Sequence, residues 1–138
     1  MRTPGMEDYL EQIYQLVREN GFTRISDVAA ALSVNNSSVS KMAQRLVDEG
    51  YVTFEKYGRR IALTVSGLHA GEKLLRRHQL LEAFLRQLGV PEKQIEAEVE
   101  EMEHHISWET LERIEHLVMV INEQSTLKTA LRDRQQQI

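Results

Sequence analysis

Carboxylate and imidazole side chains, which can bind divalent metal ions, are concentrated in one stretch of the chain. Six glutamates lie in residues 92–103, two histidines follow directly, and Glu109 continues the acidic trend. The same stretch also carries apolar residues at helical spacing, namely Ile95, Val99, Met102 and Ile106. We therefore expect a helix from Pro91 to about His105, with acidic groups on both sides of a buried apolar stripe.

Two flanks of this expected helix offer ligands, because a helix turns by about 100° per residue. One flank carries Glu96, Glu100, Glu103 and His104, and the other carries Glu98, Glu101 and His105. A Glu-x-x-Glu-His run places three donors within about one helical turn, which suits chelation of a metal ion. Spacing does not choose between the flanks. A solvated acidic helix with histidines near its C-terminus is an equally good interpretation.

Three further polar residues are candidates for the same chemistry. His78 interrupts an apolar stripe in another expected helix, in register with Leu74 and Leu81. A histidine in that position is usually a hydrogen-bonded core residue, but it is also how a ligand reaches an interior site. Asp8 and Glu11 lie three residues apart beside the apolar stripe of the first expected helix, where solvation alone explains them.

The first half of the chain contains the signals of three helices and a hairpin. The first helix is expected to begin with Thr3 as N-cap and Pro4 at its first position, and to end at Gly21. A short helix should follow from Ser26, and a third from about residue 37 to 49. Two alternating segments, 51–57 and 60–64, then predict a hairpin with its tip at 58–59. This order is that of a winged helix-turn-helix.

The second half predicts helices only. A long helix follows Ser66 and ends at about Leu88, and Ser107 is placed to cap a later helix. The apolar stripe of that later helix is either a dimer surface or internal core, and the polar tail from Ser125 predicts a loosely held helix. We expect a mainly α fold with a winged helix-turn-helix DNA-binding domain in residues 1–70. An all-helical metal-binding and dimerisation domain should follow in residues 71–138.

The third expected helix has the properties of a DNA-recognition helix. Its exposed positions are polar, and small hydroxyl and amide groups can approach phosphates and base edges closely. Two arginines at the expected hairpin tip suit phosphate contact or a narrow minor groove. The candidate DNA-binding residues are Asn36, Ser37, Ser38, Ser40, Lys41, Gln44, Arg45, Arg59 and Arg60. The alternative is a small helix–hairpin fold with a solvated serine face.

Composition limits the remaining possibilities. The 138 residues carry a formal net charge of −4 and contain no cysteine, which excludes disulfides and thiolate metal sites. Acidic and basic residues balance in residues 1–65, so the excess acid lies in the remainder. No apolar run approaches the roughly 18 residues of a membrane span, and the chain does not begin like a secretory signal. We expect a cytoplasmic protein with no membrane partner and no organic cofactor.

Nearly the whole chain resembles the DtxR/MntR family of metal-dependent transcriptional repressors, and most closely its manganese transport regulators. The resemblance rests on residues 3–14 (TPGMEDYLEQIY), 36–42 (NSSVSKM), 77–82 (RHQLLE) and 99–105 (VEEMEHH). It implies a repressor, not an enzyme, that binds operator DNA as a homodimer when metal occupies an interdomain site. The ligands that it implies are Asp8, Glu11, His78, Glu100, Glu103 and His104. Glu101 and His105 would then not be ligands.

The resemblance also bears on the metal. The iron-sensing branch of the family has a methionine and a cysteine where this sequence has Asp8 and Glu100. Carboxylates and imidazoles suit Mn²⁺ better than sulfur does. The four carboxylates among the implied ligands carry −4, which two divalent ions would neutralise. We therefore expect a binuclear site with two Mn(II) per subunit, in a repressor of manganese uptake genes.

Two other classes of protein compete with this interpretation. Residues 101–104 match the Glu-x-x-His pattern of helical di-metal enzymes, but no good second copy exists and the DNA-reading elements would be left unexplained. A winged-helix regulator that senses an organic ligand, with the acidic helix merely solvated, is the other alternative. The organic-ligand regulator would be favoured if titration calorimetry detected no binding of Mn²⁺ near micromolar concentrations.

Overall fold

The computed structural model describes residues 4–55, 57 and 59–137, and these divide into two compact units. Unit 1 is Met1–Leu75 and unit 2 is Arg76–Ile138, so the division falls within the long helix α4 (Val65–Gln87). The mainly helical fold with a small sheet agrees with the sequence expectation, and the domain limits at residues 70 and 71 stay a prediction.

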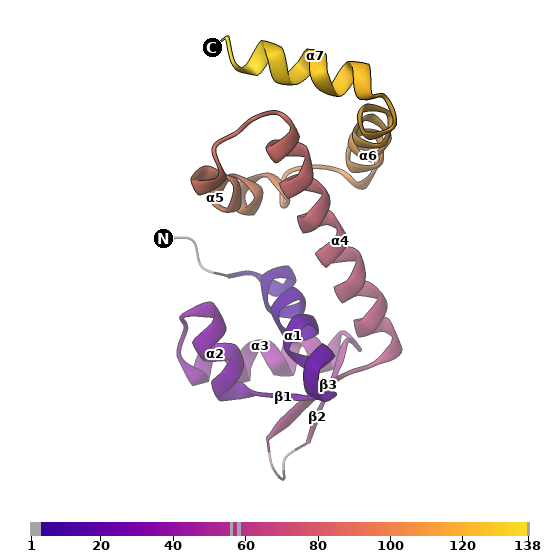
Figure 1. The fold of residues 1–138 in the computed structure, drawn as a ribbon. Helices are drawn as coiled ribbons and strands as arrows, with labels where there is room; N and C mark the ends of the chain where they lie inside the picture. The colour runs from indigo at the N-terminus through magenta and orange to yellow at the C-terminus, as the bar shows by residue number, and fades with distance from the viewer. Residues whose placement is uncertain (1–3, 56, 58, 138) are drawn as a thin grey trace. The chain divides into compact units, whose positions relative to one another are not determined.

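Unit 1 has the helix-turn-helix and wing that the sequence predicts. Its elements, coloured indigo to magenta in Figure 1, are α1 (Met6–Asn20), β1 (Thr23–Arg24), α2 (Ile25–Leu32), α3 (Asn36–Asp48), β2 (Val52–Glu55) and β3 (Arg60–Leu63). The sheet order is β1-β3-β2, and both pairings are antiparallel. The two-residue strand β1 was not predicted, because it is defined by its pairing with β3 and not by its own sequence.

One apolar core joins the helices and the wing of unit 1. Its most deeply buried side chains come from α1, α2, α3 and β3, and include Ile13, Val28, Val39, Leu46 and Ile61. The first turns of α4 pack closely on α1. A Cβ atom added at Gly71 would lie only 2.6 Å from side-chain atoms of Tyr14. Burial of this shared apolar core holds α1 and α3 together in one unit.

The start of α1 differs from the sequence expectation. Thr3, the predicted N-cap, lies outside the described residues, and Pro4 precedes the helix and is not its first residue. Gly5 is the N-cap, with extended backbone, and its N–H donates a hydrogen bond to Asp8 Oδ2 at 2.9 Å. This side-chain acceptor at the third helical position favours the later start. The predicted end is confirmed: Gly21 has φ 81° and its N–H donates to the Val17 carbonyl.

Unit 2 consists of helices around a smaller core. After the second part of α4 come α5 (Glu92–Met102), α6 (Trp108–Glu123) and α7 (Ser125–Gln135). The buried residues of this core are Leu81, Leu85, Ile95, Val99 and Leu111. The expected helix in the tail is present as α7, which has no buried residue. No helix among the described residues is long and apolar enough to cross a membrane.

Helix α5 is shorter than predicted. It ends at Met102 with Glu103 as C-cap, so His104 and His105 lie in the turn that follows, and Pro91 is the N-cap instead of the first helical residue. The turn is tight, with the His105 N–H donating to the Met102 carbonyl at 3.0 Å. Ser107 then caps α6 as predicted, since its Oγ accepts from the Thr110 N–H. The early end of α5 gives the chain room to make this second cap.

Candidate functional site

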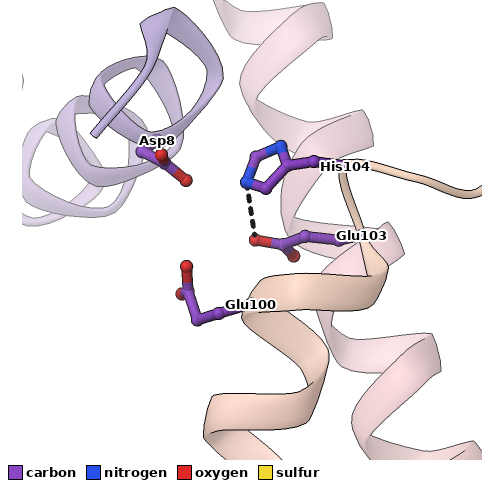
Figure 2. Close-up of side chains that lie close together, drawn as sticks. All are labelled: Asp8, Glu100, Glu103 and His104. Carbon is purple, nitrogen blue, oxygen red and sulfur yellow. Dashed lines mark ion pairs between the residues drawn. The ribbon is translucent and has the colours of Figure 1, made fainter. Parts of the chain in front are cut away.

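Four of the predicted metal ligands lie in unit 2, and three of them gather around a buried carboxylate. Glu103 is fully buried, and its Oε2 lies 3.0 Å from Nδ1 of His78 on α4. Its Oε1 lies 3.6 Å from Nε2 of His104 (Figure 2). One ligand atom each from Glu100, Glu103 and His104 lies within 4.8 Å of the others. The last turn of α5 and the middle of α4 therefore bring carboxylate and imidazole donors together.

The cluster fits a divalent cation. Glu103 Oε1 has no hydrogen-bond partner within the described residues, although the side chain is 0% exposed. An ionised carboxylate in that state is costly unless a positive charge compensates it. The donors are oxygens and ring nitrogens without sulfur, the set that suits hard to intermediate divalent metals. A metal ion would supply both the missing charge and a partner for the orphaned oxygen.

His78 makes a second contact that the sequence reasoning missed. Its Nε2 lies 3.2 Å from Oε1 of Glu82, one helical turn further along α4. Glu82 in turn lies 3.9 Å from the Arg86 guanidinium. The i, i+4 spacing of His78 and Glu82 was the signal that could have indicated this pair. If one ring nitrogen of His78 binds a metal ion, the other can donate its N–H to a carboxylate, as supporting residues do at metal sites.

The other two predicted ligands lie on α1, in unit 1. Asp8 and Glu11 are three positions apart, so their side chains leave the same side of that helix. Asp8 accepts the hydrogen bond from the Gly5 N–H described above, and Glu11 is 8% exposed. Asp8 is also labelled in Figure 2. Their part in a metal site stays a prediction.

The two flanks of α5 differ in burial. Glu103 is buried and His104 is half-buried, whereas Glu101 and His105 on the other flank are exposed. Glu96, Glu98 and the predicted ligand Glu100 are exposed as well. The flank implied by the family resemblance is thus the one that reaches the interior of unit 2, and the ligand roles themselves stay a prediction.

Helix α3, the predicted recognition helix, begins with a side-chain cap. Asn35 Oδ1 accepts hydrogen bonds from the Ser38 N–H and from the Ser37 hydroxyl, both at 2.8 Å. Asn35 was not among the predicted site residues, although an asparagine before a helical stripe is a known capping signal. The cap orders the first turn of α3, from which Asn36 and Ser37 project.

Most predicted DNA-binding residues are exposed on unit 1. Only Ser38 is half-buried, and the exposed ones are Asn36, Ser37, Ser40, Lys41, Gln44, Arg45, Arg59 and Arg60. Gln44 Nε2 donates to Asp48 Oδ1 at 3.1 Å, which leaves its Oε1 to accept from a ligand. Arg59, in the wing turn, has φ 50°, a left-handed conformation that is uncommon for arginine. These residues form a polar and cationic surface, and their contacts with DNA stay a prediction.

Comparison with known proteins extends these observations. Family models match residues 1–59 (iron dependent repressor, N-terminal DNA binding domain) and residues 64–126 (iron dependent repressor, metal binding and dimerisation domain). The chain is 50% identical over 135 residues to the HTH-type transcriptional regulator MntR of Geobacillus kaustophilus, covering 98% of this chain and 95% of that protein. Identity to the Bacillus subtilis regulator of the same name is 48% over 135 residues, covering 98% and 94%.

A solved structure, that of the manganese regulator SloR, resembles the chain with a TM-score of 0.74 and 31% sequence identity. The match covers 85% of this chain and 54% of that one, so the chain spans about half the length of this structural relative.

Proposed function

The chain belongs to the DtxR/MntR family of metal-dependent transcriptional repressors, and we propose that within this family it is a manganese-responsive repressor. It would bind operator DNA as a homodimer when Mn(II) is bound, and control genes of manganese uptake in the cytoplasm. Membership in a family of DNA-binding repressors confirms that the chain is not an enzyme, so the di-metal enzyme alternative is excluded.

The observation that carries this proposal is the buried Glu103 carboxylate. Its interior position between two imidazoles, with one oxygen lacking a hydrogen bond among the described residues, has a simple explanation if a cation binds there. The proposed ligands are Asp8, Glu11, His78, Glu100, Glu103 and His104. Their lack of sulfur supports Mn²⁺, and so does the similarity of the chain to the manganese regulator SloR.

We propose two metal ions per subunit on the ground of charge. The four carboxylates of the proposed ligand set carry −4 when ionised, and the two histidines bind metals as neutral imidazoles. A single divalent ion would leave two uncompensated negative charges in a partly buried cluster. Two ions neutralise it.

The proposed mechanism follows from which helices carry the ligands. Bound divalent ions would supply positive charge between carboxylates that otherwise repel one another. Asp8 and Glu11 lie on α1, which shares its buried core with the recognition helix α3. Whatever holds α1 therefore also holds α3, and favours the population of molecules that is competent to bind DNA. By linkage, DNA must tighten metal binding by the same factor.

The test is binding of operator DNA titrated with each metal in turn. Because the operator is unknown, duplexes are first selected from a random pool with the protein in Mn²⁺, and affinity is then measured by fluorescence anisotropy. We expect tight binding in Mn²⁺ and a loss of at least about 100-fold in chelator, a coupling of roughly 3 kcal/mol. Equal binding in chelator and in Mn²⁺ would refute the proposal.

Two measurements separate its parts. Titration calorimetry should give two Mn²⁺ per subunit, and a value of one would reject the binuclear site while leaving the repressor intact. Replacement Glu103→Gln should abolish the metal response of DNA binding. The matched control is Glu101→Gln, which changes the same group on the exposed flank of the same helix and should leave the response unchanged.

A further inference from the structure

Two arginines of unit 1 lie against one aromatic ring. The guanidinium carbon of Arg60 lies 4.4 Å from the centroid of the Phe22 ring, and that of Arg24 lies 5.8 Å from it. Both distances are within the range of a cation–π interaction. Phe22 follows the end of α1, Arg24 ends β1, and Arg60 begins β3 at the base of the wing. Strands β1 and β3 and the residue that directly precedes β1 thus form this arrangement, which we call the arginine pair.

The strand register puts the two arginines on one face of the sheet. Arg24 is the direct partner of Arg60 in the antiparallel pairing of β1 with β3. The preceding pair, Thr23 and Ile61, is buried, while both arginines are exposed. Directly paired residues project to the same face of a sheet, and successive residues alternate. Arg24 and Arg60 therefore stand side by side on the solvent face, over the Phe22 ring.

Electrostatics make this arrangement unusual without a ligand. Like charges directly opposite each other on a sheet are destabilising. Glu55 is the partner of Arg60 on β2, but no ion pair is present at either guanidinium within the part of the chain that the structure describes. The ring offsets part of the repulsion by attracting both cations. An anion placed between them would offset the rest.

We propose that Arg24 and Arg60 together bind one backbone phosphate of duplex DNA and that Phe22 positions both guanidinium groups. The proposal rests on the proposed DNA-binding function, to which it adds Arg24 and Phe22. Guanidinium groups suit phosphate because their N–H edges match its oxygens, and stacking on a ring leaves those edges available. The position next to Arg59 in the wing turn, on the solvent face, favours the phosphate of DNA over a free anion.

The first test replaces one cation. Arg24→Ala should weaken binding about tenfold, and equally for a selected operator and an unrelated duplex, because phosphate contacts carry no sequence information. Because a homodimer loses one such cation in each half-site, the slope of log K against log salt should fall by about 1.8, twice the value for one phosphate contact. Arg18→Ala is the matched control: Arg18 is exposed and lies 5.5 Å from the Tyr14 ring, but has no arginine opposite it. Its affinity and salt slope should equal those of the wild type.

A second test addresses Phe22. Phe22→Leu keeps an apolar side chain but removes the ring, and should weaken binding severalfold, whereas Phe22→Tyr should bind like the wild type. Combining Phe22→Leu with Arg24→Ala should cost less than the sum of the single effects, since both act on the same contact. Circular dichroism of each variant checks that unit 1 is folded. Equal affinity of the Leu and Tyr variants would remove the positioning role of the ring.

Chemical substitution in the DNA gives the sharpest test. Neutral methylphosphonates are placed one at a time along the operator backbone. At one position per half-site the wild type should lose affinity while Arg24→Ala is unaffected. The proposal that the arginine pair binds a phosphate is overturned if no such position exists. It is also overturned if Arg24→Ala binds DNA normally, or if Arg18→Ala shows the same loss of affinity. Wild-type protein that binds no duplex with any metal would instead refute the proposed function itself, and with it the phosphate-binding role of the arginine pair.

Discussion

The two units of the chain use their interiors differently. In unit 1 the core is almost wholly apolar, and the nine acidic and nine basic side chains of residues 1–75 lie mostly at the surface. Unit 2 carries the whole formal charge of −4, has a smaller apolar cluster, and buries Glu103 and Arg77 beside it. Stability in unit 1 follows mainly from apolar packing, although Glu11 is buried there too, whereas the stability of unit 2 depends more on what compensates the charge of its fully buried Glu103.

This difference has a functional meaning. A DNA-binding unit must keep its surface constant, and a close-packed apolar core gives one well-ordered state. A sensor must change its free energy when its ligand binds, and a buried carboxylate next to imidazoles does so. The chain therefore separates rigidity and responsiveness into two regions, and each can be disturbed by itself.

The largest effect is expected from the core of unit 1. Leu46→Ala removes a fully buried side chain of α3 and should lower the free energy of unfolding by about 2–5 kcal/mol. Added Mn²⁺ should not reverse the packing defect. Far-ultraviolet circular dichroism follows both units, while fluorescence of Trp108, the one tryptophan, reports unit 2. In urea unfolding, the midpoint followed by dichroism should fall further than the midpoint followed by fluorescence.

The same substitution at Leu68 is the control, because that side chain is 45% exposed on the part of α4 in unit 1. Leu68→Ala should cost much less than Leu46→Ala. Identical losses at the two positions, or fluorescence and dichroism midpoints that fall together, would mean that the units do not have separate cores.

The next effect concerns the buried carboxylate of unit 2. Wild-type protein should gain about 2.7 kcal/mol of stability per site at metal concentrations 100 times the dissociation constant. Glu103→Gln should abolish this gain without lowering the stability of the metal-free protein, because a buried neutral amide costs less than a buried anion. Thermal unfolding with Mn²⁺ and with chelator measures both. A variant that is strongly destabilised in chelator would show that the Glu103 charge is structural.

A smaller effect is expected at the start of the recognition helix. Asn35→Ala removes the acceptor for the Ser38 N–H and should cost about 1 kcal/mol, with no dependence on Mn²⁺. Asn35→Asp keeps the cap and should retain stability, but its negative charge near the phosphates should weaken DNA binding. Urea unfolding and fluorescence anisotropy separate these effects. If both variants lose stability equally, the cap is not what Asn35 contributes.

Local sequence patterns predicted most of the fold. Helices α1, α3 and α6 follow from apolar stripes bounded by glycine or a capping side chain, and the wing follows from alternation around residues 58–59. The errors lie where longer-range interactions decide. Strand β1 is two residues long and depends on pairing with β3, and α5 ends three residues early because the chain must turn toward the Ser107 cap.

The candidate site was predictable in part. One-turn spacing was enough to expect that Glu100, Glu103 and His104 lie together, but rotation about a helix does not say which flank faces the core. The family resemblance supplied that choice. Contacts that depend on tertiary packing, such as that of Glu103 with His78, could not be derived from spacing alone. The arginine pair was missed because β1 was missed.

The smallest expected effect on stability is at an ion pair on the surface of unit 2. It shows how an exposed charge differs from the buried charge of Glu103. Arg86 and Glu92 form a two-fold hydrogen-bonded ion pair at 2.7 and 2.9 Å. The hydrogen bond from Arg86 holds the pKa of Glu92 below its usual value of 4.5. Because the folded-state pKa is lowered, the stabilisation is present above the unfolded-state pKa and disappears as pH falls through the folded-state value.

Glu92→Gln should therefore be slightly less stable than the wild type at pH 7, and the difference should vanish in more acidic solution. Exposed pairs are screened by water and salt, so the loss should be smaller than that of Asn35→Ala and should shrink further in high salt. Trp108 fluorescence in unit 2 measures it. Glu96→Gln, on the same helix and without an ion pair among the described residues, should show neither dependence. A pH-dependent loss as large as the metal effect at Glu103 would contradict the distinction between surface charge and buried charge in this unit.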